Sequence, residues 1–94
     1  MAKLLDDNNI KYTANRSFKT VNKKGYRNHR EVDFCLHEDL SVLRREHPIR
    51  YIEVKSGKLD RDQQEDLRNA GIYTDIIIPL DIIYWEIHGL SLQK

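Results

Sequence analysis

Three residues of this chain have the types and the spacing to hold a divalent metal at a phosphodiester. Glu53 and Lys55 lie two positions apart in the stretch 49–55, which has the apolar pattern of a strand, so both side chains should project from one face. Asp33 lies in a second predicted strand, 31–36. If the two strands pair, Asp33 can face Glu53 and Lys55, which places two carboxylates beside an ammonium group.

The apolar residues of these two strands should point the other way, into the core. Ile52 and Val54 alternate with Glu53 and Lys55. In the second strand, the predicted inward and outward sets are Val32, Phe34 and Leu36 against Glu31, Asp33 and Cys35. A carboxylate and an ammonium group on a central strand are costly to desolvate unless they have partners or a function. The alternative explanation is a structural ion pair between Glu53 and Lys55, with Asp33 facing solvent.

The elements that must position these residues can be predicted along the chain. We expect a short helix at 2–8 and a hairpin of strands 10–18 and 31–36, with Gly25 taking positive φ in its turn. Residues 37–48 fit either a short helix or an extension of the strand. Asp60 can cap a helix that ends at Gly71, with Gln63 completing a capping box.

Two further elements follow this helix. Residues 73–78 contain three consecutive isoleucines, which predicts an interior strand parallel to 49–55. Residues 82–87 fit a last strand or a short helix, with Trp85 in the core or on a dimer surface. The sequence thus predicts one α/β domain over 1–94.

Charge is unevenly distributed along the chain. Residues 1–30 hold eight Lys/Arg and two Asp/Glu (8 − 2 = +6), whereas 31–94 hold eight and thirteen (8 − 13 = −5). A basic half suits a polyanionic partner, although solvated surface charge explains the pattern equally well.

The cysteine content and the length of the apolar runs indicate the cellular compartment. A single cysteine, Cys35, allows no intramolecular disulfide and no cysteine-based zinc site. No apolar run approaches the roughly 20 residues of a membrane span, and we see no signal peptide. These features favour the cytoplasm and no membrane partner.

The order of elements and the pair Asp33 and Glu53-Val54-Lys55 resemble the PD-(D/E)XK nuclease superfamily, over residues 2–78. Its restriction-endonuclease-like fold has an αβββαβ core, a mixed sheet flanked by helices. Asp33 matches the first acid, although Val32 replaces the proline often found before it. The phrase 55–59, Lys-Ser-Gly-Lys-Leu, followed by Gln63 and Gln64, looks like the virus-type replication and repair nucleases and the Holliday-junction resolvases.

The resemblance implies a role for each matching residue. Asp33 and Glu53, with the backbone carbonyl of Val54, would bind Mg²⁺ or Mn²⁺. Lys55 would position or deprotonate the attacking water, or steady the phosphate, and Gln64 would orient water or a phosphate. A further acid expected in such enzymes stays open among Asp6, Asp7 and Glu31.

Nucleic acid, and DNA in particular, is the expected partner. The candidate phosphate-binding residues are basic side chains around the predicted hairpin and just after the motif: Arg16, Lys19, Lys23, Lys24, Arg27, Arg30, Lys58 and Arg61. No base-reading helix is predicted, which favours structure-selective or nonspecific binding over sequence-specific binding. We expect an endonuclease that prefers a DNA structure, acts in repair or recombination, and forms a homodimer. The alternatives are a toxin-type nuclease for tRNA or DNA with an immunity partner, a non-catalytic nucleic-acid-binding module of the same fold, and a plain assembly protein.

Overall fold

The chain forms an α/β domain with a four-stranded mixed sheet and three helices in the order αβββαβα, seen in a computed structural model that describes residues 1–91. The elements are α1 (Ala2–Asp7), β1 (Tyr12–Val21), β2 (Arg27–Leu40), β3 (Ile49–Val54), α2 (Arg61–Asn69), β4 (Thr74–Ile77) and α3 (Pro79–His88). The molecule is elongated, 44 × 26 × 22 Å.

The strands follow chain order, β1-β2-β3-β4. The first three are antiparallel neighbours, and β3 pairs with β4 in parallel, as predicted. The Ile49–Val54 strand is therefore interior. The prediction that residues 73–78 are interior was wrong: β4 is an edge strand, Ile77 is buried, and Ile78 is exposed. The isoleucine run misled because apolar residues indicate burial of the faces of a strand and do not reveal whether both of its edges are paired.

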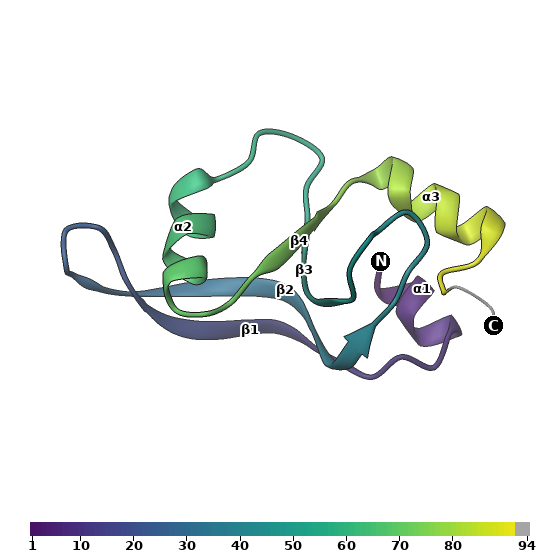
Figure 1. Cartoon of the computed structure of the whole chain (residues 1–94), viewed down its shortest axis with the longest axis horizontal. Helices are drawn as coiled ribbons and strands as arrows, with labels where there is room; N and C mark the ends of the chain where they lie inside the picture. Colours follow the sequence, from purple (N-terminus) through teal and green to yellow (C-terminus); the bar gives the residue numbers. More distant parts are fainter. Residues whose placement is uncertain (92–94) are drawn as a thin grey trace.

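Helices cover the two ends of the sheet differently. Figure 1 shows α2 beside the end from which the β1–β2 hairpin projects, and α1 and α3 together at the other end. One apolar cluster joins α1 and α3 to the sheet through Leu5, Ile52 and Trp85. A smaller cluster places Leu67 of α2 against Val32 and Cys35 of β2. None of the helices within residues 1–91 has the length and apolar character needed to span a membrane.

The packing of β2 corrects the predicted alternation. Val32 packs with Cys35 in the α2 cluster, whereas Phe34 and Leu36 belong to the other cluster. Regular alternation would put Val32 and Phe34 on one face. The alternation of side chains between the two faces is therefore interrupted between Val32 and Cys35, although the pairing register with β1 is unchanged on either side. On β1, Asn15 lies between the paired residues Ala14 and Arg16 and has φ 53.

For residues 37–48 and 82–87, the sequence allowed either a helix or a strand, and the structure shows which one forms. Residues 37–40 extend β2, and the segment up to Ile49 contains no helix. The β2–β3 ladder shifts register between Cys35 and Leu40, and the Arg50 guanidinium donates to the carbonyls of Leu36 (3.1 Å) and His37 (3.0 Å) there. Residues 82–87 are helical as part of α3.

Candidate functional site: two carboxylates and a lysine where β2 leaves β3

Asp33 lies at the point where β2 separates from β3. The ladder between these strands pairs Cys35 with Tyr51 and Phe34 with Ile52, and it records no pair beyond Ile52. The next contact uses a side chain, because Asp33 Oδ2 accepts a hydrogen bond from the Val54 backbone N–H at 2.9 Å. The Asp33 carboxylate is thereby fixed against the end of β3.

Glu53 and Lys55 are the other two residues of the candidate site. Glu53 is only 4% exposed, and its Oε1 lies 3.4 Å from the Lys55 Nζ. Burial raises the pKa of Glu53, and the charge of Asp33 raises it further, while Lys55 and the Asp33 backbone oppose these effects. The structure thus brings together the three residues that the sequence singled out, with the two carboxylates close enough to repel each other.

The second Glu53 oxygen, Oε2, is buried and has no hydrogen-bond partner among the described residues. A buried carboxylate oxygen without a donor is unfavourable unless a cation or a solvent molecule approaches it. Carboxylate oxygens suit Mg²⁺ and Mn²⁺, ions that retain several waters and need few protein ligands. Asp33 and Glu53 therefore fit such an ion, and the chemistry of the donors favours it over Zn²⁺.

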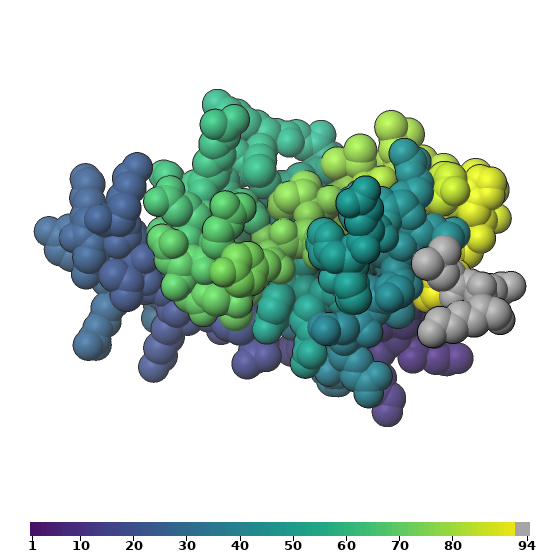
Figure 2. Space-filling view, in the orientation of Figure 1, coloured from purple at the N-terminus to yellow at the C-terminus, as the bar shows by residue number. Residues whose placement is uncertain are grey.

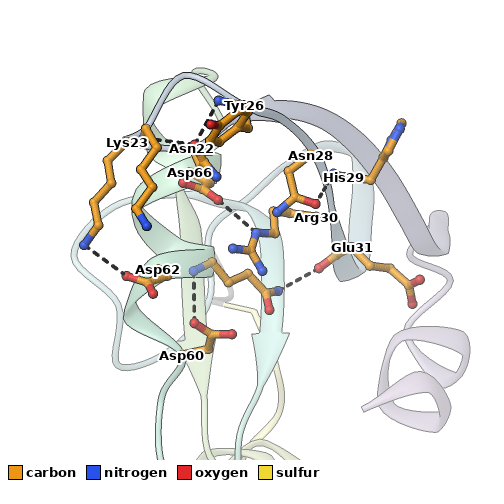
Figure 3. Close-up of polar contacts among 12 residues, drawn as sticks. Asn22, Lys23, Tyr26, Asn28, His29, Arg30, Glu31, Asp60, Asp62 and Asp66 are labelled. Carbon is orange, nitrogen blue, oxygen red and sulfur yellow. Dashed lines mark hydrogen bonds and ion pairs between the residues drawn. The ribbon is translucent and has the colours of Figure 1, made fainter.

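The structure also shows the surroundings of the other candidate metal ligands. Within residues 1–91, no group of three or more His, Cys, Asp or Glu side chains is arranged to hold a metal. Glu31 is exposed on β2, and its side chain points away from α2 (Figure 3). Asp6 neighbours Tyr12, whose pKa is raised by burial and then by that carboxylate. The Val54 carbonyl remains a predicted ligand.

Gln64 lies on α2 and is fixed to the neighbouring strand. Its Oε1 accepts a hydrogen bond from the Thr74 hydroxyl on β4, and its Nε2 is buried without a partner in the part of the chain that the structure describes. Thr74 was not singled out from the sequence, and no sequence signal marks it, because threonine is an ordinary strand residue. The Nε2 amino group of Gln64 thus keeps both of its N–H donors unused.

Both the backbone N–H and the side chain of Gln63 form hydrogen bonds within the fold. Its backbone N–H donates to Asp60 Oδ1 at 3.1 Å, which confirms Asp60 as the helix cap. The predicted capping box is not completed, because the Gln63 side chain donates to the Glu31 carbonyl at 2.9 Å instead. This bond ties the start of α2 to β2.

The eight candidate phosphate-binding residues fall into different environments. Arg30 is paired with Asp66 of α2 at 3.0 Å, and Lys23 lies 3.9 Å from Asp62 (Figure 3). Arg16 stacks over the Phe18 ring, with its guanidinium carbon 4.7 Å from the ring centre. The remaining five side chains are exposed: Lys19, Lys24, Arg27, Lys58 and Arg61.

Comparisons with known proteins add no relative: no family model matches the chain, and neither does any curated protein or solved structure. The assignment of function therefore depends on the geometry described above.

Proposed function

We propose that this chain is a metal-dependent endonuclease that hydrolyses phosphodiester bonds of DNA. The observation that carries the proposal is the grouping of Asp33, Glu53 and Lys55, with a buried Glu53 oxygen that lacks a partner. The first six elements also follow the αβββαβ order of the restriction-endonuclease-like fold, with Asp33 on the second strand and Glu53 and Lys55 at the end of the third. These features support the resemblance to PD-(D/E)XK nucleases.

Each residue has a task in this proposal. Asp33, Glu53 and the Val54 carbonyl would hold Mg²⁺ or Mn²⁺. The ion would supply charge stabilisation at the scissile phosphate and a lower pKa for a coordinated water. Lys55 holds the attacking water or the phosphate from its position beside Glu53. Gln64 uses its free Nε2 donor to orient water or a phosphate oxygen, while Thr74 keeps its carbonyl oxygen engaged.

The test combines metal binding with cleavage. Mg²⁺ binding is measured by calorimetry on the wild type, Asp33→Asn and Glu53→Gln, and cleavage is measured on single strands, duplexes, flaps, four-way junctions and tRNA. Lys55→Gln is included in the cleavage assays. We expect Mg²⁺- or Mn²⁺-dependent cutting of DNA, with a preference for one shape, that all three substitutions abolish.

Matched control variants are available on the exposed surface. Asp39→Asn, Glu86→Gln and Lys11→Gln change the same residue types at exposed positions outside this group, and they should retain cleavage. Cutting of tRNA alone would favour the toxin-type alternative and a search for an immunity partner. No metal binding and no cutting in either ion would overturn the catalytic proposal.

The homodimer is also a proposal, and α3 is the surface that supports it. Within residues 1–91, four of the eight exposed large hydrophobic residues lie on α3 or just before it: Ile78, Leu80, Ile83 and Ile87. Their spacing along α3 places Leu80, Ile83 and Ile87 on one helix face. Sedimentation of the wild type beside Ile83→Lys and Ile87→Lys tests this, because only a dimer through α3 should dissociate in both variants.

A further inference from the structure

The β1–β2 hairpin extends beyond the rest of the sheet as an arm. We define the hairpin arm as residues 16–32, in which Arg16 pairs with Val32 and Val21 with Arg27. Figure 1 shows it projecting past α2, and Figure 2 shows its tip as a separate projection with side chains extended into solvent. Six Lys/Arg and one Asp/Glu lie within it (6 − 1 = +5). The arm is thus a two-stranded, strongly basic ribbon.

The two faces of the arm differ in burial. The face toward α2 holds partly or fully buried residues: Phe18, Thr20, Asn28, Arg30 and Val32. The opposite, outer face is exposed throughout, and it consists of Ser17, Lys19, Val21, Arg27, His29 and Glu31. Figure 3 shows this division, since Arg30 points toward α2 whereas His29 and Glu31 point away from it.

The charges differ between the faces as well. On the α2 side, Arg30 is neutralised by Asp66. The pocket of about 260 Å³ between the arm and α2 is lined by three cations and three carboxylates: Lys23, Lys24, Arg30, Asp62, Glu65 and Asp66. On the outer face, neither Lys19 nor Arg27 forms an ion pair within residues 1–91. The charges that line the pocket on the α2 side therefore balance, whereas the outer face has an excess of positive charge, with Lys19 and Arg27 against Glu31, that attracts a polyanion. The outer face is therefore the side on which a nucleic acid can approach the arm.

The shape of the arm selects among nucleic acids. The major groove of B-form DNA is about 12 Å wide and admits a two-stranded β-ribbon. The major groove of A-form RNA is too deep and narrow for side chains to read. A single strand offers no groove and is held mainly by stacking on aromatic side chains. Outside the α2 face, the arm has only two aromatic side chains, Tyr26 at the tip and His29 on the outer face, so it lacks a row of side chains on which successive bases could stack.

We infer that the hairpin arm docks in the groove of double-stranded DNA, with Lys19 and Arg27 on its outer face contacting the phosphates that border the groove. This inference rests on the proposed nuclease function and names duplex DNA as the substrate class. Strand β2 runs without a break from Arg27 to Asp33. Six residues of strand span roughly 20 Å, about the rise of six base pairs. Arg27 therefore contacts the duplex within about six base pairs of the scissile phosphate.

The experiment measures binding in EDTA, where cleavage cannot interfere. Fluorescence anisotropy is recorded with a DNA duplex, an RNA duplex and a DNA single strand of equal length. The variant is Lys19→Gln with Arg27→Gln. Its control is Lys3→Gln with Arg68→Gln, which removes the same charge from exposed positions on α1 and α2. Circular dichroism confirms that both variants are folded.

We expect the arm variant to bind the DNA duplex about 10-fold more weakly, and its salt dependence to decrease by about two phosphate contacts. The control should change affinity by less than about 2-fold, which is the effect of net charge alone. The RNA duplex and the single strand should bind more weakly to the wild type and lose less. Equal effects of variant and control, equal losses on all three ligands, or no duplex binding by the wild type would each overturn the inference.

The same proteins separate this inference from the nuclease proposal. Asp33→Asn should bind the duplex like the wild type, because Asp33 lies outside the arm. Arm-dependent duplex binding without any metal-dependent cutting would sink the nuclease and keep the arm. Metal-dependent cutting that persists in the arm variant, with unchanged duplex affinity, would support the nuclease proposal and overturn the role of the arm.

Discussion

Asp33 Oδ2 accepts a hydrogen bond from the backbone N–H of Val54 at 2.9 Å, so a side chain joins β2 to β3 where their backbone ladder has ended. The bond uses one of the two carboxylate oxygens and leaves the other available to a ligand. Asp33 thus has a structural role in the fold and a proposed role in metal binding, and substitutions can separate the two.

Asp33→Ala and Asp33→Asn should differ in stability but agree in activity. Alanine leaves the Val54 N–H without its partner, which should cost about 1 kcal/mol of unfolding free energy. Asparagine keeps an oxygen acceptor and should stay close to the wild type, while both variants lose Mg²⁺ binding and cleavage. Urea unfolding and calorimetry measure these effects. An Asp33→Asn protein that still cleaves would contradict the metal role.

The main site residues could be predicted because their signal is local. Glu53 and Lys55 share a strand face through simple alternation, and the end of an interior strand brings Asp33 beside them. The hydrogen bond from Thr74 to Gln64 could not be predicted, since it depends on how α2 lies over β4. The pairing of Arg30 with Asp66 was missed for the same reason: the two residues are far apart in sequence.

The fold, like the site, was predictable where it depends on neighbouring residues and was not predictable where it depends on long-range contacts. Caps, turns and apolar spacing located α1, α2 and the β1–β2 hairpin, because each depends on neighbouring residues. The interrupted alternation of β2 near Asp33 follows from long-range pairing and has no local signature. The edge position of β4 likewise depends on the end of the sheet, which the Ile76–Ile78 run does not reveal.

Glu53 should make stability depend on pH in the absence of metal. Its folded pKa is raised above the ordinary 4.5, so between these two values the folded state holds a proton that the unfolded state has lost. Stability therefore falls as pH rises through this interval, and the full penalty is present above it. Glu53→Gln should melt at a higher temperature than the wild type near neutral pH in EDTA, and this gain should disappear below pH 4.5.

Two controls accompany the pH experiment. Glu86→Gln replaces an exposed carboxylate on α3 and should leave the melting temperature unchanged at each pH. Added Mg²⁺ should stabilise the wild type more than Glu53→Gln near neutral pH, because a cation relieves the buried charge. A melting-temperature difference that is the same at all pH values would show that burial of the Glu53 charge is not its cause.

Thr74 should act on cleavage only through Gln64. Thr74→Val removes the hydroxyl that holds the Gln64 carbonyl oxygen, and the misplaced amide should lower kcat by about 10- to 100-fold with little change in KM. Gln64→Ala should lose at least as much. The double variant should be no slower than Gln64→Ala, which a double-mutant cycle of kcat values measures. Additive losses would mean that Thr74 has an independent role.

The ion pair between Arg30 and Asp66 should stabilise the fold and contribute little to DNA binding. Asp66 is buried, and its Oδ2 lies 3.0 Å from Arg30 Nε, so Arg30→Ala leaves a buried charge without a partner and should cost about 3 kcal/mol. Lys23→Ala is the matched control: its pair with Asp62 is longer, 3.9 Å, and exposed, so its loss should cost less than about 1 kcal/mol.

Arg30→Met with Asp66→Leu should recover most of the stability, because neither charge remains buried. Urea unfolding measures all three proteins, and anisotropy then measures duplex binding by the folded double variant. Wild-type duplex affinity in that variant is the expected outcome, and a 10-fold loss would instead place Arg30 among the phosphate contacts.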